Sequence, residues 1–133
     1  MKKLRIFIYA ATMVAFMACG GSADTPESIT KALYSQLQNE NYEKAMEIAL
    51  KYADLSEMDE EYRSLSKDEL IKVGAKRQKE RYSEGIKTFE IEKVEIDEEG
   101  NNATVYLNII TKSDNEISHR ERFYKKDDKW YVR

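Results

Sequence analysis

Residues 103–112 read Ala-Thr-Val-Tyr-Leu-Asn-Ile-Ile-Thr-Lys, and this stretch decides the fold. Ala103, Val105, Leu107 and Ile109 occupy every second position. Side chains two residues apart in a strand point to the same face of a sheet. Most of the intervening positions hold β-branched or aromatic residues, which favour strands. The stretch therefore predicts a β-strand with one buried face.

The segments on both sides of this strand share its period of two. Residues 88–96 predict a strand with a bulge, because the apolar positions change parity between Ile91 and Val94. Two further strands are expected over residues 117–125 and 130–133. The turns between these segments are short, and short turns join antiparallel neighbours. We therefore expect a four-stranded antiparallel sheet.

The preceding half of the chain has helical spacing instead. We expect helices over residues 26–38, 42–53 and 67–82, with a break at 39–41 and a loop or short helical turn in the acidic stretch 54–63. Thr25 and Pro26 suit the cap and first turn of the first helix. Ser66 and Glu69 have the spacing of a capping box. Helices followed by an antiparallel meander indicate an α+β fold.

The N-terminus has the order of a secretory signal. Lys2, Lys3 and Arg5 form a basic start, residues 6–18 carry no charge, and Cys19 follows. A basic end stays in the cytoplasm while an apolar segment enters the membrane. The uncharged run spans 13 residues, whereas a spanning helix needs about 20. A permanent transmembrane helix is therefore the weaker interpretation, and a secreted protein cleaved after residue 18 is the stronger rival.

This arrangement resembles a bacterial lipoprotein signal peptide, in which the cysteine is lipidated and becomes the first residue of the mature protein. The resemblance implies a signal peptide over residues 1–18, a lipidated Cys19 and tether over residues 19–25, and a single α+β domain over residues 26–133. Gly20 stands where an aspartate disfavours transfer to the outer membrane, and residues 20–23 hold no acidic cluster. The resemblance thus implies an outer-membrane lipoprotein on the periplasmic face.

Composition excludes several classes of function. Residues 1–18 hold three basic and no acidic residues, so their removal changes the net charge from −3 to −6. An acidic exported chain is a poor candidate for nucleic acid, whose phosphates are bound by basic residues. Cys19 is the only cysteine, which leaves no internal disulfide and no Cys–His zinc site. Residues 97–108 fail as a calcium loop, because asparagines stand at the glycine and glutamate positions. We expect no metal and no cofactor.

The whole layout resembles small bacterial lipoproteins whose domain of unknown function is allied to lumazine-binding-like and nuclear-transport-factor-two-like domains, with a cystatin-like α+β cone. The features that carry this resemblance are Cys19, Pro26, the helix junction at residues 39–45 and the closing strand pair at residues 123–132. It implies N-terminal helices on the concave face of a curved four-stranded sheet, with a pocket at the open end. The wider superfamily has a short strand before the third helix, and residues 54–63 show none.

The candidate site residues lie on the third expected strand. His119 and Glu121 share one face with Ile117 and Phe123. Catalytic relatives use a buried carboxylate with a tyrosine or histidine, so this pair is a weak candidate for acid–base catalysis. A polar pair that stabilises the sheet explains it better, because the chain offers no nucleophile or oxyanion donor beside it. His119 and Glu121, with Tyr34 and Tyr52, are also weak candidates for ligand binding.

Three functions follow in order of preference. The first is a lipid-anchored domain of the cell envelope that binds a small apolar ligand or a segment of a partner protein in its cone. The second is a structural or interaction protein whose own side chains fill the pocket. The third is an enzyme with His119 and Glu121 as acid and base. The expected partners are the membrane, through the lipid, and an unknown small ligand or envelope protein, but no nucleic acid.

Overall fold

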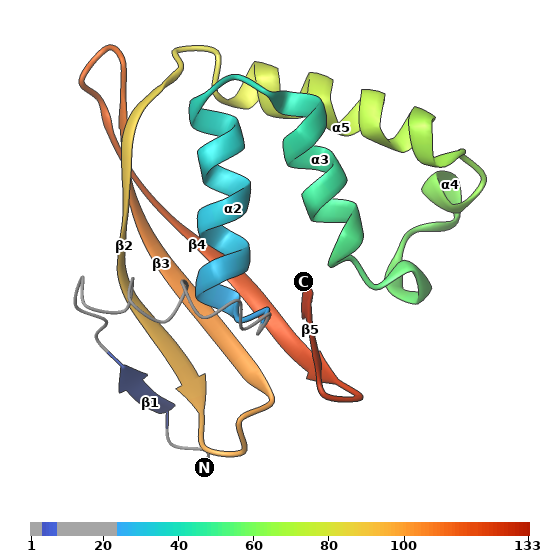
Figure 1. Cartoon of the computed structure of the whole chain (residues 1–133), viewed down its shortest axis with the longest axis vertical. Helices are drawn as coiled ribbons and strands as arrows, with labels where there is room; N and C mark the ends of the chain where they lie inside the picture. The colour runs from blue at the N-terminus through green and yellow to red at the C-terminus, as the bar shows by residue number, and fades with distance from the viewer. Residues whose placement is uncertain (1–3, 8–23) are drawn as a thin grey trace.

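A computed structural model describes residues 4–7 and 24–133 of the chain (Figure 1). The predicted lipidation site, Cys19, lies outside the described residues, as do most of the predicted signal peptide and the tether up to residue 23. Among the helices that the structure describes, none combines the length and apolar character needed to span a membrane.

The helices begin where the capping signals predict. They are α2 (Pro26–Gln38), α3 (Tyr42–Lys51), the 3-10 turn η2 (Leu55–Glu57), α4 (Glu60–Arg63) and α5 (Lys67–Arg81). The Thr25 side chain accepts a hydrogen bond from the backbone of Ser28 at 3.1 Å, and Ser66 accepts one from Glu69 at 3.2 Å. Each cap satisfies a backbone N–H that the first turn leaves unpaired. The prediction for residues 54–63 is also confirmed, because η2 and α4 are both short helical turns.

The strands form an antiparallel meander in chain order. They are β2 (Ile86–Asp97), β3 (Asn102–Thr111), β4 (Glu116–Lys126) and β5 (Lys129–Val132). The register of β2 against β3 shifts between Ile91 and Lys93. This shift is the bulge that the change of parity predicts, since one extra residue moves the following side chains to the other face.

A short fifth strand adds to the four expected strands, all of which are present. β1 (Leu4–Phe7) pairs antiparallel with β2, with Leu4 opposite Asp97 and Phe7 opposite Val94. It belongs to the segment in which we expected only a signal peptide. The outer edge of β2 has unpaired backbone groups that any extended segment can use, and residues 4–7 of the intact chain occupy it. Removal of residues 1–18 would leave the expected four strands.

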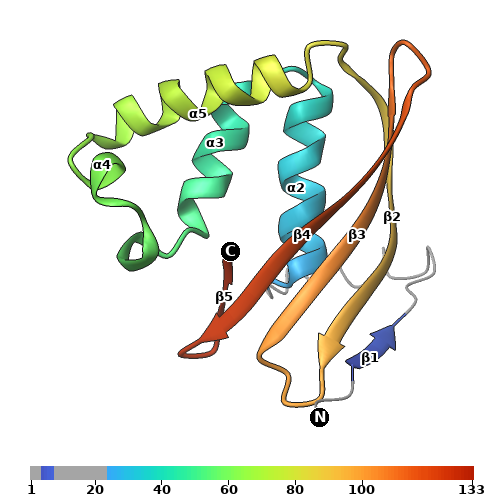
Figure 2. The same ribbon diagram turned by 180° about the vertical axis from the view of Figure 1, so that it is seen from behind.

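All the long helices lie on one side of the sheet, but only α2 packs directly against it (Figures 1 and 2). α2 lies against β2 and β3, while α3 packs on α2 and α5 packs on α3, away from the sheet. One buried cluster joins α2, α3 and the end of α5 to the sheet, and comprises Tyr34, Leu37, Ala45, Tyr82, Ile86, Leu107 and Ile109. A second comprises Ile29, Val94, Ala103, Val105 and Phe123. The alternating apolar residues of β3 thus contribute to both clusters, Leu107 and Ile109 to the first and Ala103 and Val105 to the second.

The last strand closes the structure against the end of α3. The backbone N–H of Val132 donates to the Tyr52 carbonyl at 2.8 Å, and Ala53 forms an isolated parallel bridge with Val132. Nearby, the Tyr124 hydroxyl donates to Asp54. Hydrogen bonds from Ser56 and Tyr124 hold the pKa of Asp54 well below its usual range.

Removal of a buried side chain from β3 should cost far more stability than an equal change at the rim. Leu107 is 1% exposed and Ile117 is 37% exposed. We expect Leu107→Ala to lower the free energy of unfolding by about 2–5 kcal/mol, because it leaves a cavity in the core. Urea unfolding should show a clearly smaller loss for Ile117→Ala. Similar losses for the two variants would contradict the assignment of the core face.

Candidate functional site

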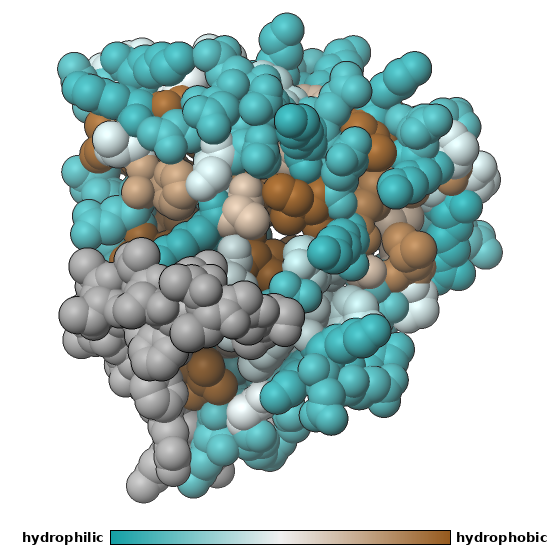
Figure 3. All heavy atoms as spheres, in the orientation of Figure 1, coloured by the Kyte–Doolittle hydropathy of each residue, from teal (hydrophilic) through white to brown (hydrophobic). Residues whose placement is uncertain are grey.

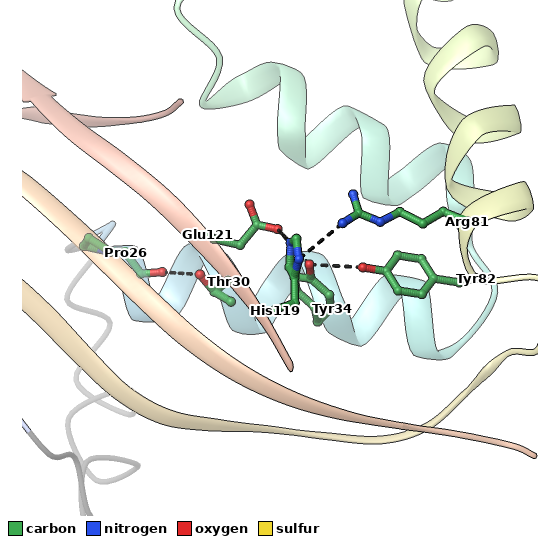
Figure 4. Close-up of polar contacts among 7 residues, drawn as sticks. All are labelled: Pro26, Thr30, Tyr34, Arg81, Tyr82, His119 and Glu121. Carbon is green, nitrogen blue, oxygen red and sulfur yellow. Dashed lines mark hydrogen bonds and ion pairs between the residues drawn. The ribbon is translucent and has the colours of Figure 1, made fainter. Parts of the chain in front are cut away.

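The two site residues predicted on β4 lie together on the concave face of the sheet. His119 Nε2 and Glu121 Oε1 are 2.9 Å apart, and both side chains are largely buried. Alternation along the strand brings them to the same face, and the buried Phe123 follows on that face. Both side chains lie next to Tyr34 of α2 and to the end of α5 (Figure 4).

α2 supplies a third member of the group. Tyr34 is 1% exposed, and its hydroxyl donates to Glu121 Oε1 at 2.7 Å. Burial, followed by the negative charge of Glu121, raises the pKa of Tyr34 far above its usual value. The phenol therefore keeps its proton and acts as a hydrogen-bond donor throughout the physiological range.

Two residues from the end of α5 complete the cluster, and the sequence analysis did not assign either to the site. The Tyr82 hydroxyl lies 3.3 Å from that of Tyr34. Because Tyr34 gives its only proton to Glu121, Tyr82 must be the donor in this contact. The Arg81 guanidinium lies 3.2 Å from His119 Nδ1. We call Tyr34, Arg81, Tyr82, His119 and Glu121 the polar cluster.

The contact with Arg81 decides which histidine nitrogen carries the proton. A guanidinium can only donate, so His119 Nδ1 must accept. In the neutral ring the proton is then on Nε2, which donates to Glu121 Oε1. Oε1 thus receives hydrogen bonds from both His119 and Tyr34. No described residue donates to Oε2, and this oxygen is available to a ligand.

A cavity of about 570 Å³ opens beside the polar cluster. Its wall combines apolar side chains from α2, α3 and β5 with a larger number of polar and basic ones from α5, β4 and the last residue. The apolar residues are Leu33, Ala49 and Val132, and the polar and basic ones are Gln78, Arg81, Ser118, His119, Arg120, Glu121, Arg122 and Arg133. The deeper part of the cone, next to α2, is filled by the rings of Tyr34, Tyr82 and Phe89. The remaining space suits a small molecule or a short segment with an apolar body and a polar group.

Tyr52 is not part of this cluster. It lies at the end of α3 and lines a different hollow, together with Trp130. The sequence analysis named it, with Tyr34, His119 and Glu121, as a weak candidate for ligand binding. Helical spacing predicts which face of a helix a tyrosine occupies. It does not predict which part of the fold the end of that helix reaches.

An apolar groove lies outside the cone, between α3 and the segment from η2 to the start of α5. Its volume is about 740 Å³, and Leu50, Leu55, Met58, Leu65 and Leu70 line it. Leu55 is 57% exposed. Figure 3 shows hydrophobic surface between the lower end of α3 and α4.

Among the described residues, no group of three His, Cys, Asp or Glu side chains could hold a metal ion.

The fold is an α+β cone of the NTF2-like type. The crystal structure of a candidate NTF2-like transpeptidase from Campylobacter jejuni matches with a TM-score of 0.57 and 25% sequence identity, over 82% of this chain and 97% of that chain. The solution structure of a SEC-C motif-containing protein from Rhodopseudomonas palustris reaches a TM-score of 0.45 at 18% identity, over 90% of this chain and 83% of that chain. That score is too low to equate the two folds.

Comparisons of sequence find no such likeness. No protein-family model matches the chain, and a search of curated proteins finds no match.

The buried phenol of Tyr34 should make stability depend on alkaline pH. At neutral pH we expect Tyr34→Phe to cost about 1.5–3 kcal/mol, the usual contribution of a hydrogen bond to a charged group. Above about pH 10 the unfolded chain loses the tyrosine proton while the folded chain keeps it, so the free energy of unfolding of the wild type falls as pH rises. The phenylalanine variant lacks this dependence.

The stability difference between wild type and Tyr34→Phe should therefore shrink by up to about 1.4 kcal/mol per pH unit above pH 10. Chemical unfolding between pH 8 and pH 11 measures it. Tyr82→Phe serves as the matched control, and it should cost less at neutral pH because its hydroxyl makes only the longer contact. A difference that stays constant up to pH 11 would contradict the role given to Tyr34.

Proposed function

We propose that this protein is a lipid-anchored domain of the bacterial cell envelope that binds a small ligand or a partner segment in its cone without catalysing a reaction. The observation that supports binding is the cavity beside the polar cluster, which combines apolar and basic side chains with the unused Glu121 Oε2. Pockets in which polar groups converge beside apolar side chains are typical of ligand sites. The ligand would have an apolar body and a hydrogen-bond donor directed at Glu121.

The anchor rests on the N-terminal sequence. Lipid on Cys19 would tether the domain to the outer membrane, on its periplasmic face. Each buried acyl CH₂ contributes about 0.8 kcal/mol, so several chains give a lasting attachment. The domain would then meet its ligand or partner in the periplasm.

An enzyme with His119 and Glu121 as acid and base is less well supported. Both nitrogens of His119 already have partners in the polar cluster, and Glu121 Oε1 has two. An acid–base catalyst needs a proton-transfer atom within reach of a substrate and a second group that stabilises the developing charge. Glu121 Oε2 meets the first requirement, but His119 and Glu121 are already hydrogen-bonded to each other rather than poised on either side of a substrate, so binding remains the preferred function.

The Campylobacter protein is named for transpeptidation, and this chain has little to support that reaction. Serine transpeptidases use the pattern Ser-x-x-Lys, which occurs here at Ser28–Lys31 and at Ser64–Lys67. The Ser28 hydroxyl donates within the cap of α2, and the Ser64 hydroxyl donates to the Glu61 carbonyl. Both hydroxyls are exposed parts of helix ends, away from the cone.

A second candidate function is that of an interaction protein. The apolar groove between α3 and α5 favours it, because exposed apolar surface on this scale marks sites of protein contact. The protein's own side chains Tyr34, Tyr82 and Phe89 fill the inner part of the cone. A filled cone is what this alternative expects.

Ligand binding predicts a molecule that co-purifies with the protein. Native mass spectrometry of the processed protein from membranes of its own host should show an added mass. Glu121→Gln should reduce the occupied fraction to about a tenth or less, the effect of losing one charge-assisted hydrogen bond. The control is Lys76→Ala on the exposed face of α5. A clean apo mass for the wild type would favour the interaction protein instead.

The anchor predicts a specific defect when its cysteine is replaced. We expect Cys19→Ala to yield an unprocessed precursor or a protein released from the membrane, since no acyl chain can be attached. Membrane fractionation and intact-mass analysis measure both outcomes. Unchanged partitioning into the membrane would show that Cys19 is not the anchor.

A further inference from the structure

A second hollow lies at the end of the molecule where the described domain begins. Its volume is about 410 Å³. Asp24 contributes from the residue pair that precedes α2, Lys51 and Tyr52 from the end of α3, and Asp128, Lys129, Trp130 and Tyr131 from the β4–β5 turn and β5. Figures 1 and 2 both place the start of α2, the end of α3 and β5 at this same end. We call this hollow the tether-proximal pocket.

The tether-proximal pocket combines two cations, two carboxylates and three aromatic rings. Lys51 Nζ lies 5.3 Å from the centre of the Tyr52 ring, and burial together with Asp24 raises the pKa of the Tyr52 phenol. Lys51, Lys129, Asp24 and Asp128 are exposed, and none of them forms an ion pair with another described residue. Their charges balance, so the pocket as a whole is zwitterionic.

The β4–β5 turn holds the charged groups of the pocket in a defined position. Asp127 and Asp128 have φ angles of 52° and 63°, and Lys126 pairs with Lys129 across them. Positive φ at both central residues is the signature of a two-residue hairpin turn that matches the twist of its strands. Asp128 and Lys129 are therefore presented on a short turn of defined geometry rather than on a long loop.

Covalent geometry limits how far the pocket can lie from a lipid on Cys19. Five peptide units join Cys19 to Asp24, and an extended chain spans at most about 3.6 Å per residue, or about 18 Å in all. The headgroup layer of a bilayer is itself several ångströms deep on each side. A domain anchored through Cys19 therefore carries the tether-proximal pocket at or just above the lipid headgroups. This step rests on the proposed lipid anchor.

We infer that the tether-proximal pocket binds the phosphoethanolamine headgroup of a membrane phospholipid. Lys51 and Lys129 would meet the phosphate, whereas Asp24 and Asp128 would accept hydrogen bonds from the ammonium. Trp130 and Tyr52 are amphipathic rings of the kind that gather at the membrane interface. A headgroup with phosphate alone would leave both carboxylates facing negative charge, and the balanced charge of the pocket thus favours a zwitterion with a donating amine.

Trp130 gives a direct measurement, because it is the only tryptophan in the chain and it lines the pocket. The processed lipoprotein would be reconstituted into vesicles of phosphatidylethanolamine with phosphatidylglycerol, and into vesicles in which phosphatidylcholine replaces the phosphatidylethanolamine. Phosphatidylcholine keeps the phosphate but has no N–H to donate. We expect Trp130 emission at shorter wavelength in the ethanolamine vesicles, and at least twofold stronger quenching by spin-labelled headgroups.

Variants of the pocket separate headgroup recognition from simple proximity. Asp24→Asn combined with Asp128→Asn should abolish the preference for ethanolamine, and asparagine tolerates the positive φ of residue 128. Lys51→Ala with Lys129→Ala should reduce the quenching in both kinds of vesicle. The control Lys76→Ala, on α5, should leave both signals unchanged. Loss of the preference in the control as well would contradict a specific site.

The mass of the processed N-terminus, measured on the same sample, separates the two proposals. Lipid on Cys19 with equal Trp130 signals in both kinds of vesicle would overturn the headgroup site and leave the anchor intact. An unmodified Cys19 would overturn the anchor, and with it the argument that brings the pocket to the headgroups.

Discussion

Burial of the Tyr34 hydroxyl is the constraint on which the arrangement of the domain depends. The ring lies between α2 and the sheet, and a buried hydroxyl without a partner would be costly. Its partners come from two other elements, Glu121 on β4 and Tyr82 at the end of α5. One phenol thus specifies the distance between the first helix, the third long helix and a strand. The ring also packs against Phe89 on β2, with centroids 5.9 Å apart, and this contact adds dispersion to the polar restraint.

The packing of the helices explains why the cone is filled at one side and open at the other. α2 packs on β2 and β3, so large side chains fill the space between them, whereas α5 packs on α3 and stands away from the sheet. The polar cluster lies at the border between these two regions. Its internal hydrogen bonds leave Glu121 Oε2 without a donor among the described residues, and a ligand of the proposed kind would have to supply one. Purely apolar molecules would leave Glu121 Oε2 without water or a partner.

The sequence predicts the features that depend on local pattern. Alternation over residues 103–109 identifies the core face of β3, and the parity change near Ile91 identifies the bulge. Capping residues at Thr25 and Ser66 give the starts of two helices. The face shared by His119 and Glu121 also follows from alternation, because the period of two holds along β4.

Features that depend on how helices and strands pack together could not be predicted from periodicity and capping signals. Arg81 is one of several charged residues on α5, and only the packing of α5 on α3 brings it to His119. The position of Tyr52, beside Trp130 and apart from the polar cluster, depends on packing in the same way. β1 was missed because residues 4–7 read as part of an apolar signal segment, whereas strand pairing depends on a free edge elsewhere.

The bridge between Ala53 and Val132 joins residues about eighty positions apart. Closing so long a loop is entropically expensive and slows folding. Residues 129–132 thus attach the last strand of the sheet to the end of α3, and the shape of the hollows beside β5 depends on that contact.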